Sequence, residues 1–521
     1  QVHLEKVHRD RALAHLRQVL GGFADREPWV MVATNDRGVT IRQGFTRDPA
    51  EIAAALDRVE TSQVSHFGLD QEMRSLLREI GDVNAEAGNL AIGDIKFGSG
   101  GFASRRSGAG AGDPGAADGS GDGFGSSPTE GNREDIAEHV SVQAQALVPQ
   151  IMAHAQRRYD QLQGTFRVLD SFFDHVAGAP GRKAVLYVSG GLSLNPAEAL
   201  FEAYERRVVG VSGIRSRGAS LGREIERFDL TPRFEELVAR ANASGVTFYA
   251  VDASPPAILD RGSAANTGGS LGLDSRFASQ VATIEERNEH ESLRRIAEET
   301  GGRSSLSAAD LDGMLETFLA DFDDFYSLGY RIDDRPAADV RELEVRLTRE
   351  ARQRLGRGVE VRHRKQVGSK SGAQEMAEKT LSALVLSTYD NPLGVELSAE
   401  EQTLVEEGKY GVPVTVQVPL GKLVLLPGER AHQAKVTIYV AVLDEAGRTS
   451  PVARQACPVR VPNEELLVAL GRHAGGGVRR LMRPGRQRIA VGVEDEISTI
   501  ASTVALDVTV GEDPAAGPEA R

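Results

Sequence analysis

The chain has 521 residues, of which 40% are hydrophobic and 26% charged, a composition that predicts two to four globular domains. Its net charge of −14 gives it no general attraction for phosphates, so no nucleic-acid partner is expected. The single cysteine, Cys457, excludes an internal disulfide framework and any cysteine-based zinc site. No apolar run reaches the roughly 18 residues of a membrane-spanning helix, so no span is expected.

The first part of the chain alternates between helical and strand patterns. Leu13, Leu16 and Leu20 recur at helical spacing in "RDRALAHLRQVLGGF". The apolar runs "PWVMVATND" and "GVTIRQGFT" surround an Asn-Asp-Arg-Gly turn and predict a hairpin. "DPAEIAAALDRVE" predicts a helix that Asp48 caps and that has Pro49 at its first position. The helical pattern then continues to about residue 86.

Residues 97–132 differ sharply in composition, since Gly, Ser, Ala and Asp dominate and large apolar residues are nearly absent. Such a segment cannot bury enough surface to offset its ordering entropy, so we expect a disordered insertion. It is not expected to be a domain boundary, because the helical pattern resumes at once. Residues 133–178 predict one or two long helices, with Pro149 as a candidate kink.

The stretch "KAVLYVSGGLSLN", residues 183–195, predicts a buried parallel strand followed by a tight turn. A helix then follows, and "VTFYAVDAS" repeats the buried-strand pattern up to Asp252. Strands that alternate with helices indicate a mostly parallel, doubly wound α/β sheet. Such sheets place ligands outside the carboxyl ends of their strands, so Ser189 and Asp252 are candidate ligand-edge residues. An Asp in this position is also often a cap for the next turn.

The remainder divides into the end of this domain and a second one. "FYSLGYRID", "VRELEVRLTR" and "GVEVRHRKQ" predict three further strands. A linker is expected at 367–383. From 384 to 511 the apolar residues alternate with period two between Gly, Pro and Asp, which predicts an all-β sandwich. Residues 512–521 are expected to be a disordered tail.

The order of "GRKAVLYVSGG", "ASGVTFYAVDAS", "LRRIAEETGGR" and "FYSLGYRI" closely resembles that of the bacterial VWFA-related domain proteins. These are divergent relatives of von Willebrand factor type A domains, and the resemblance covers about residues 1–366. It implies a Rossmann-like doubly wound fold, a role in binding another protein, and a following β-sandwich. It also implies an extracytoplasmic location, periplasmic or secreted, although this chain starts at Gln1 and shows no signal peptide.

Type A domains typically hold Mg²⁺ in a metal-ion-dependent adhesion site built from Asp-x-Ser-x-Ser, a Thr and an Asp, whose oxygens suit a hard cation. In this sequence Gly190 stands where the resemblance would place the last Asp, beside Ser189. No Asp-x-Ser-x-Ser occurs near Gln1, so the first strand is expected to be truncated. Thr61 is a candidate for the Thr on position alone. We therefore expect a degenerate site with no metal and no cofactor.

Two other functions compete with a non-enzymatic binding module. In the first, metal ligands lie upstream of Gln1 and the domain is a metal-dependent adhesion module. In the second, Ser189 or Asp252 serves a hydrolase. The second is weaker because a nucleophile elbow reads G-x-S-x-G, and Tyr187 occupies the position of its first glycine.

Overall fold

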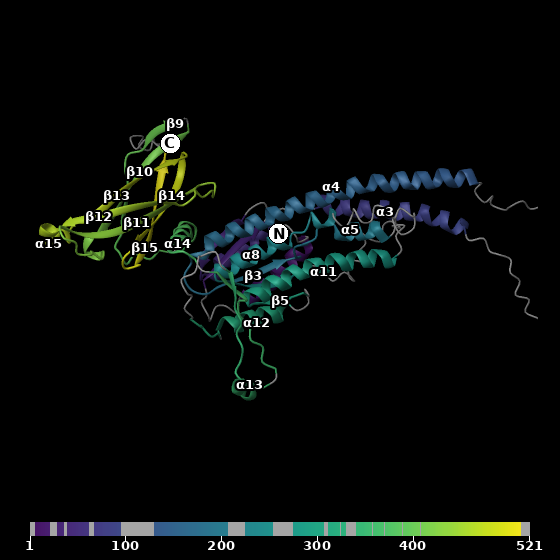
Figure 1. The fold of residues 1–521 in the computed structure, drawn as a ribbon, viewed down its shortest axis with the longest axis horizontal. Helices are drawn as coiled ribbons and strands as arrows, with labels where there is room; N and C mark the ends of the chain where they lie inside the picture. Colours follow the sequence, from purple (N-terminus) through teal and green to yellow (C-terminus); the bar gives the residue numbers. More distant parts are fainter. Residues whose placement is uncertain are drawn as a thin grey trace, which may run out of the picture.

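The fold is described from a computed structural model of the 521-residue chain (Figure 1). The residues that it describes are 6–20, 29–35, 39–61, 67–94, 130–206, 224–253, 275–306, 311–323, 325–329, 340–356, 358–368, 370–387, 389–406 and 408–511. The expected insertion at 97–132 lies outside this set up to residue 129, and so does the expected tail at 512–521. Within these ranges no helix combines the length and apolar character needed to cross a membrane.

A three-stranded parallel sheet forms the centre of the first part of the chain, in the order β3 (Lys183–Ser189), β4 (Val246–Asp252) and β5 (Arg303–Ser305). The strands β3 and β4 pair residue by residue, so Ser189 lies opposite Asp252 at their carboxyl ends. The central strand β4 is almost entirely buried, whereas β3 is half-buried along most of its length. The predicted parallel α/β sheet is thus present in a three-stranded form.

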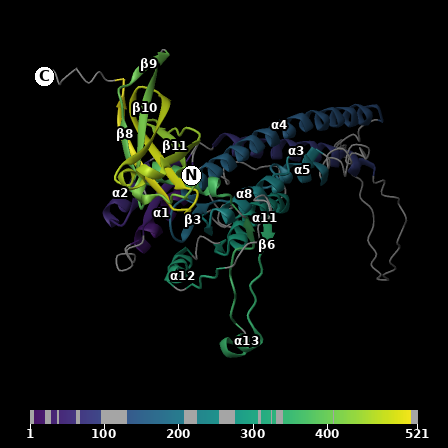
Figure 2. The same cartoon turned by 60° about the vertical axis from the view of Figure 1, so that its left-hand side comes forward.

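Helices cover both faces of this sheet because β4 alternates apolar side chains between them. Phe248 and Ala250 pack among α4 (Glu130–Ala177), α8 (Thr231–Ala243) and α11 (Ser275–Thr300). Tyr249 and Val251 face α1 (Lys6–Leu20) and α12 (Leu311–Asp323). Figures 1 and 2 show α11 running alongside the sheet and α4 extending far beyond it.

The remaining elements of this part lie around the sheet. The strands β1 (Val30–Asn35) and β2 (Val39–Thr46) form the expected hairpin as a separate antiparallel sheet, followed by α2 (Pro49–Thr61). The long helices α3 (Phe67–Asp94) and α4 pack against each other through one apolar cluster, which α5 (Glu198–Tyr204) completes. Pro149 lies inside α4 without dividing it.

The three strands predicted between 325 and 366 differ from what the structure contains. Residues 325–329 form no strand, and Phe325 and Tyr326 are 55% and 96% exposed. Only β6 (Val340–Glu342) and β7 (Gln366–Gly368) pair, antiparallel to each other and outside the main sheet. Between them lies α13 (Arg349–Leu355), at the tip of a projecting arm (Figure 1). The alternating pattern predicts extended backbone correctly, but it does not specify a neighbouring strand.

The expected linker at 367–383 contains most of helix α14 (Gly372–Leu386). A capping box at Ser371 and Gln374 starts this helix. Its apolar residues Ala383 and Leu384 are fully buried against the β-sheets that follow. The segment is therefore a packed helix that joins two parts of the molecule.

The C-terminal part is all-β, as predicted from residue 384 onward. One sheet contains β13 (His473–Met482), β10 (Lys409–Pro419), β8 (Glu396–Ala399) and β9 (Thr403–Glu406). The other contains β12 (Ala453–Pro462), β11 (Ala431–Asp444), β14 (Gly485–Asp495) and β15 (Ala501–Val510), all antiparallel. Valines and isoleucines from both sheets share one core, and the short helix α15 (Leu466–Ala469) lies at one end.

Candidate site at the carboxyl end of the parallel sheet

The turn after β3 is closed against helix α11. Ser189 is only 4% exposed, and its Oγ accepts a hydrogen bond of 3.1 Å from the backbone N–H of Gly191. Gly191 has a φ of 95°, a conformation that favours glycine. A Cβ at Gly191 would lie 2.5 Å from the carbonyl oxygen of Glu289. Glycine is therefore needed both for the turn and for the close approach of α11.

Ser292 of α11 fixes the next residue of the same loop. Its Oγ accepts a hydrogen bond of 2.9 Å from the N–H of Leu192 and donates one of 2.8 Å to the carbonyl of Glu289. These contacts hold α11 across the end of β3. Gly190 lies within this closed turn and is buried, with no side-chain oxygen to offer a cation.

Asp252, at the end of β4, pairs with a histidine that the sequence analysis did not single out. Its Oδ2 lies 2.7 Å from Nε2 of His290 on α11. The side chains of Asp252 and His290 are 7% and 21% exposed. The hydrogen bond to Asp252 raises the pKa of His290 despite partial burial, and the negative charges of Asp252 and Glu286 add to the effect. The contact with Asp252 therefore favours the protonated form of His290.

A small cleft lies beside the Ser-Gly-Gly turn, between α4 and α11. Its walls include His154 and Arg158 from α4, Ser193 from the loop, and Glu285 and Glu289 from α11. His154 is 1% exposed, and burial lowers the pKa of its imidazole although Nδ1 lies 3.3 Å from Oε2 of Glu72. The cleft therefore presents groups of both charges next to the closed strand end.

Thr61 is not brought to this edge by any contact that the structure describes. It occupies the last position of α2, is exposed, and donates its hydroxyl to the carbonyls of Asp57 and Arg58 in its own helix. Helix α2 packs against β1, β2 and α1. Of the four residues proposed from the sequence, Ser189, Gly190 and Asp252 therefore converge and Thr61 stands apart.

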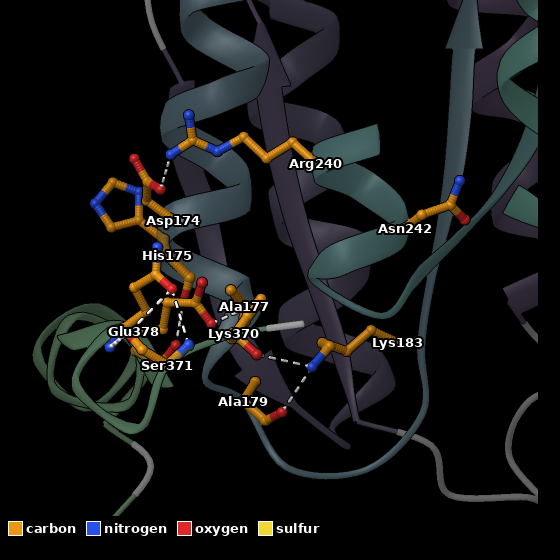
Figure 3. A network of polar contacts seen from close by, with 12 residues as sticks. Asp174, His175, Ala177, Ala179, Lys183, Arg240, Asn242, Lys370, Ser371 and Glu378 are labelled. Carbon is orange, nitrogen blue, oxygen red and sulfur yellow. Dashed lines mark hydrogen bonds and ion pairs between the residues drawn. The ribbon is translucent and has the colours of Figure 1, made fainter. Parts of the chain in front are cut away.

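The opposite end of β3 is a second polar cluster (Figure 3). Nζ of Lys183 donates to the carbonyls of Ala177 and Ala179, at 2.9 and 3.0 Å, where α4 ends. Burial lowers the pKa of Lys183 to about 8, and the positive charges of Lys370 and Arg364 contribute. Lys370 in turn pairs with Glu378 of α14 at 2.6 Å. This cluster joins the end of α4 to α14.

Tight packing reinforces that joint. The Oγ of Ser382 on α14 donates to the carbonyl of His175 on α4 at 2.6 Å. A Cβ at Gly178 would lie 2.4 Å from the backbone carbonyl of Glu378. The amino end of the sheet therefore contacts the C-terminal part of the chain through the packing of α4 against α14.

Among the described residues no group of three or more His, Cys, Asp and Glu side chains is arranged to hold a metal ion. At the sheet edge the carboxylate of Asp252 is hydrogen-bonded to His290. These residues do not fit the Mg²⁺ site of a typical type A domain, which needs several free oxygen ligands.

Comparisons with known proteins add little. No family model and no curated protein matches the chain. One solved structure, titled "X-ray structure of Northeast Structural Genomics Consortium target SoR45", shares 16% identity and covers 23% of this chain and 89% of its own. Its TM-score is 0.17, too low to support any statement about fold or function.

Sequence reasoning missed His290 because it lies 38 residues from Asp252, in a helix with no local motif around it. One signal was available. The charged stretch "ERNEHESLRRIAEET" contains a single histidine on a helix expected to follow a parallel strand. Helices that follow such strands pack near the strand ends, where an Asp would favour a cationic partner.

Proposed function

We propose that the chain is a non-enzymatic protein-binding module, a divergent von Willebrand factor type A domain followed by a β-sandwich. The observation that carries this proposal is the pair formed by Asp252 and His290 at the carboxyl end of the parallel sheet, with a distance of 2.7 Å. In a type A domain this edge holds a divalent cation. Here a protonated histidine occupies the place of positive charge beside the carboxylate.

The presence of His290 in place of a cation explains how the buried carboxylate of Asp252 can be accommodated without a metal ion. A buried carboxylate needs a hydrogen-bonding or ionic partner, because leaving it unpaired costs several kcal/mol by order of magnitude. The imidazolium of His290 fulfils that requirement from within the chain. A cation that bound Asp252 would have to displace it. Recognition would then use the rim of α11 and the adjacent cleft.

The family resemblance supports the same proposed function, a protein-binding module, and adds the proposal of an extracytoplasmic location. The degenerate site, with Gly190 and Gly191 at the strand end, is consistent with a domain that retains the fold and binds partners without Mg²⁺. The partner itself is a protein that contacts the exposed side of α11 near His290.

Site-specific photo-crosslinking tests this proposal. A crosslinking residue replaces Arg287, which is 67% exposed and lies one helical turn before His290. The matched control replaces Lys379, an exposed residue of α14 at the opposite end of the sheet. In cells that make the protein we expect a discrete adduct from position 287 alone, and it should persist when a chelator removes divalent cations. Equal adducts from both positions, or one that needs Mg²⁺, would contradict the proposal.

A hydrolase is the second candidate, since Ser189, Asp252 and His290 gather at one edge. Against it, Ser189 is 4% exposed and its Oγ accepts from Gly191, so no attacking hydroxyl faces an open site. Turnover of an ester or peptide that a Ser189→Ala variant abolishes would favour this alternative over the binding module.

A further inference from the structure

Residues 340–368, called the arm from here on, project from the body of the molecule in both views (Figures 1 and 2). The pairing of β6 with β7 forms its base, and α13 forms its tip. Two extended limbs, 343–348 and 358–365, connect base and tip without being strands. No buried residue occurs in α13.

The second limb, 358–365, is attached to the body next to the base of the arm. Arg362 binds Asp321 of α12 through both guanidinium nitrogens, with Nη1 2.6 Å from Oδ2. Arg364 donates to the carbonyl of Asn242, and the N–H of Lys365 donates to the carbonyl of Glu299 at 2.9 Å. The base is therefore a fixed support for the tip.

The tip is basic and open. Residues 340–368 contain nine Lys and Arg against four Glu, a net charge of +5 in a chain whose total is −14. The other residues together therefore carry −19. On α13 the side chains of Arg349, Arg352 and Arg354 are exposed and form no ion pair with any described residue. A strongly acidic molecule thus extends one basic projection into solvent.

Among the described residues the limbs are extended segments without a paired neighbouring strand, and the first alternates in burial as a strand does. Leu343, Val345 and Leu347 are half-buried and alternate with exposed Glu344 and Arg346. Within the described part of the chain the limbs are joined only by two hydrogen bonds, from Leu343 N–H to the Lys365 carbonyl (2.7 Å) and from Val345 N–H to Nε2 of His363 (3.2 Å). Most of their backbone groups are thus available to an added strand.

We propose that the arm binds an extended acidic segment of a partner protein. This inference rests on the proposed function and names the partner's chemistry. A strand with alternating acidic and apolar residues would satisfy the open backbone groups of a limb, while its carboxylates pair with the guanidinium groups of α13. A bilayer interior would leave the limb backbone unsatisfied. Proteins that bind single-stranded nucleic acid commonly stack bases on Phe, Tyr or Trp, and the arm contains none of these three.

The probe is a fluorescent synthetic peptide of alternating Glu and Val, about eight residues long, which is enough to span a limb. Its binding to the full chain is measured by fluorescence anisotropy. The tip variant carries Arg349→Gln, Arg352→Gln and Arg354→Gln. The matched control carries Arg74→Gln, Arg206→Gln and Arg227→Gln, three exposed arginines of the body outside α11, so that both variants lose the same charge.

We expect the tip variant to weaken peptide binding by about tenfold and the control to change it by less than about twofold. A peptide with Lys in place of Glu should not bind, and neither should one with Pro in place of Val. Equal losses in both variants, no saturable binding, or preferred binding to phosphatidylserine vesicles or duplex DNA would overturn the inference. Crosslinking at position 287 is independent of the arm, so its failure would instead contradict the proposed function.

Discussion

The two ends of the parallel sheet differ in the charge of the side chain that they hold and in how that charge is compensated. At the carboxyl end a buried acid, Asp252, meets a cationic partner, and the pKa of His290 rises. At the amino end the half-buried base Lys183 donates to backbone carbonyls near other cations, and its pKa falls to about 8. The first arrangement compensates its charge internally and leaves a rim for a ligand. The second holds the end of α4 beside α14, so the two ends of one sheet differ in how they accommodate charge.

The largest expected loss of stability comes from adding one methyl group at Gly191, in the turn at the carboxyl end of the sheet. Gly191→Ala places a Cβ on a residue with a φ of 95° and 2.5 Å from the Glu289 carbonyl. Both the backbone strain and the displacement of α11 are destabilising, by about 3 kcal/mol together. Urea denaturation measures this cost. Gly181→Ala serves as the control, because Gly181 also has a positive φ of 80° but nothing within 4 Å of its Cβ position. Equal losses in the two variants would mean that the approach of α11 is unimportant.

At the amino end, Lys183→Met removes two hydrogen bonds, to the carbonyls of Ala177 and Ala179, and should cost about 1–2 kcal/mol at neutral pH. The pH dependence has a definite sign. The pKa of Lys183 is lowered from 10.5 to about 8, so between these values the unfolded chain binds more protons and stability rises with pH. The wild-type advantage over Lys183→Met should therefore grow from pH 8 toward pH 10. A constant or shrinking difference in denaturation midpoints would refute this.

The smallest change in stability is expected for His290→Gln. Its dependence on pH has the opposite sign to that of Lys183→Met. Because the pKa of His290 is raised above 6.5, its ion pair contributes fully below pH 6.5 and loses this contribution as pH rises through the folded-state pKa. The wild-type advantage should shrink as the pH rises above 6.5, since glutamine keeps a hydrogen bond but no charge. Thermal melts across this range measure it. An advantage that increases with pH would show that His290 is neutral.

Much of the frame of the molecule follows from local sequence. The apolar runs at 184–188 and 246–251 predict buried strands because only a parallel sheet covered on both faces tolerates such continuous apolarity. The alternation after residue 384 predicts the sandwich for the complementary reason. The turn at Ser189-Gly190-Gly191 and the acid at Asp252 were likewise visible as strand ends.

What sequence reasoning could not supply was the set of contacts between distant elements. His290 contacts Asp252 from 38 residues away, and Ser382 of α14 donates to the carbonyl of His175 on α4, 207 residues away in the chain. The strand pattern at 340–365 was correct as extended backbone but wrong as part of a sheet, because alternation does not name a neighbour. Thr61 was chosen on position alone, and position in the chain does not fix position in space.

The central claim is that His290, and not a divalent cation, neutralises the carboxylate at the carboxyl end of the sheet. An NMR titration of the His290 Cε1 proton tests it directly, with the His290→Gln spectrum to assign the resonance among the 11 histidines. The account predicts a pKa above 6.5 that is the same with and without millimolar Mg²⁺. A pKa that Mg²⁺ lowers and a chelator restores would contradict it, because the cation would then displace the imidazolium from Asp252.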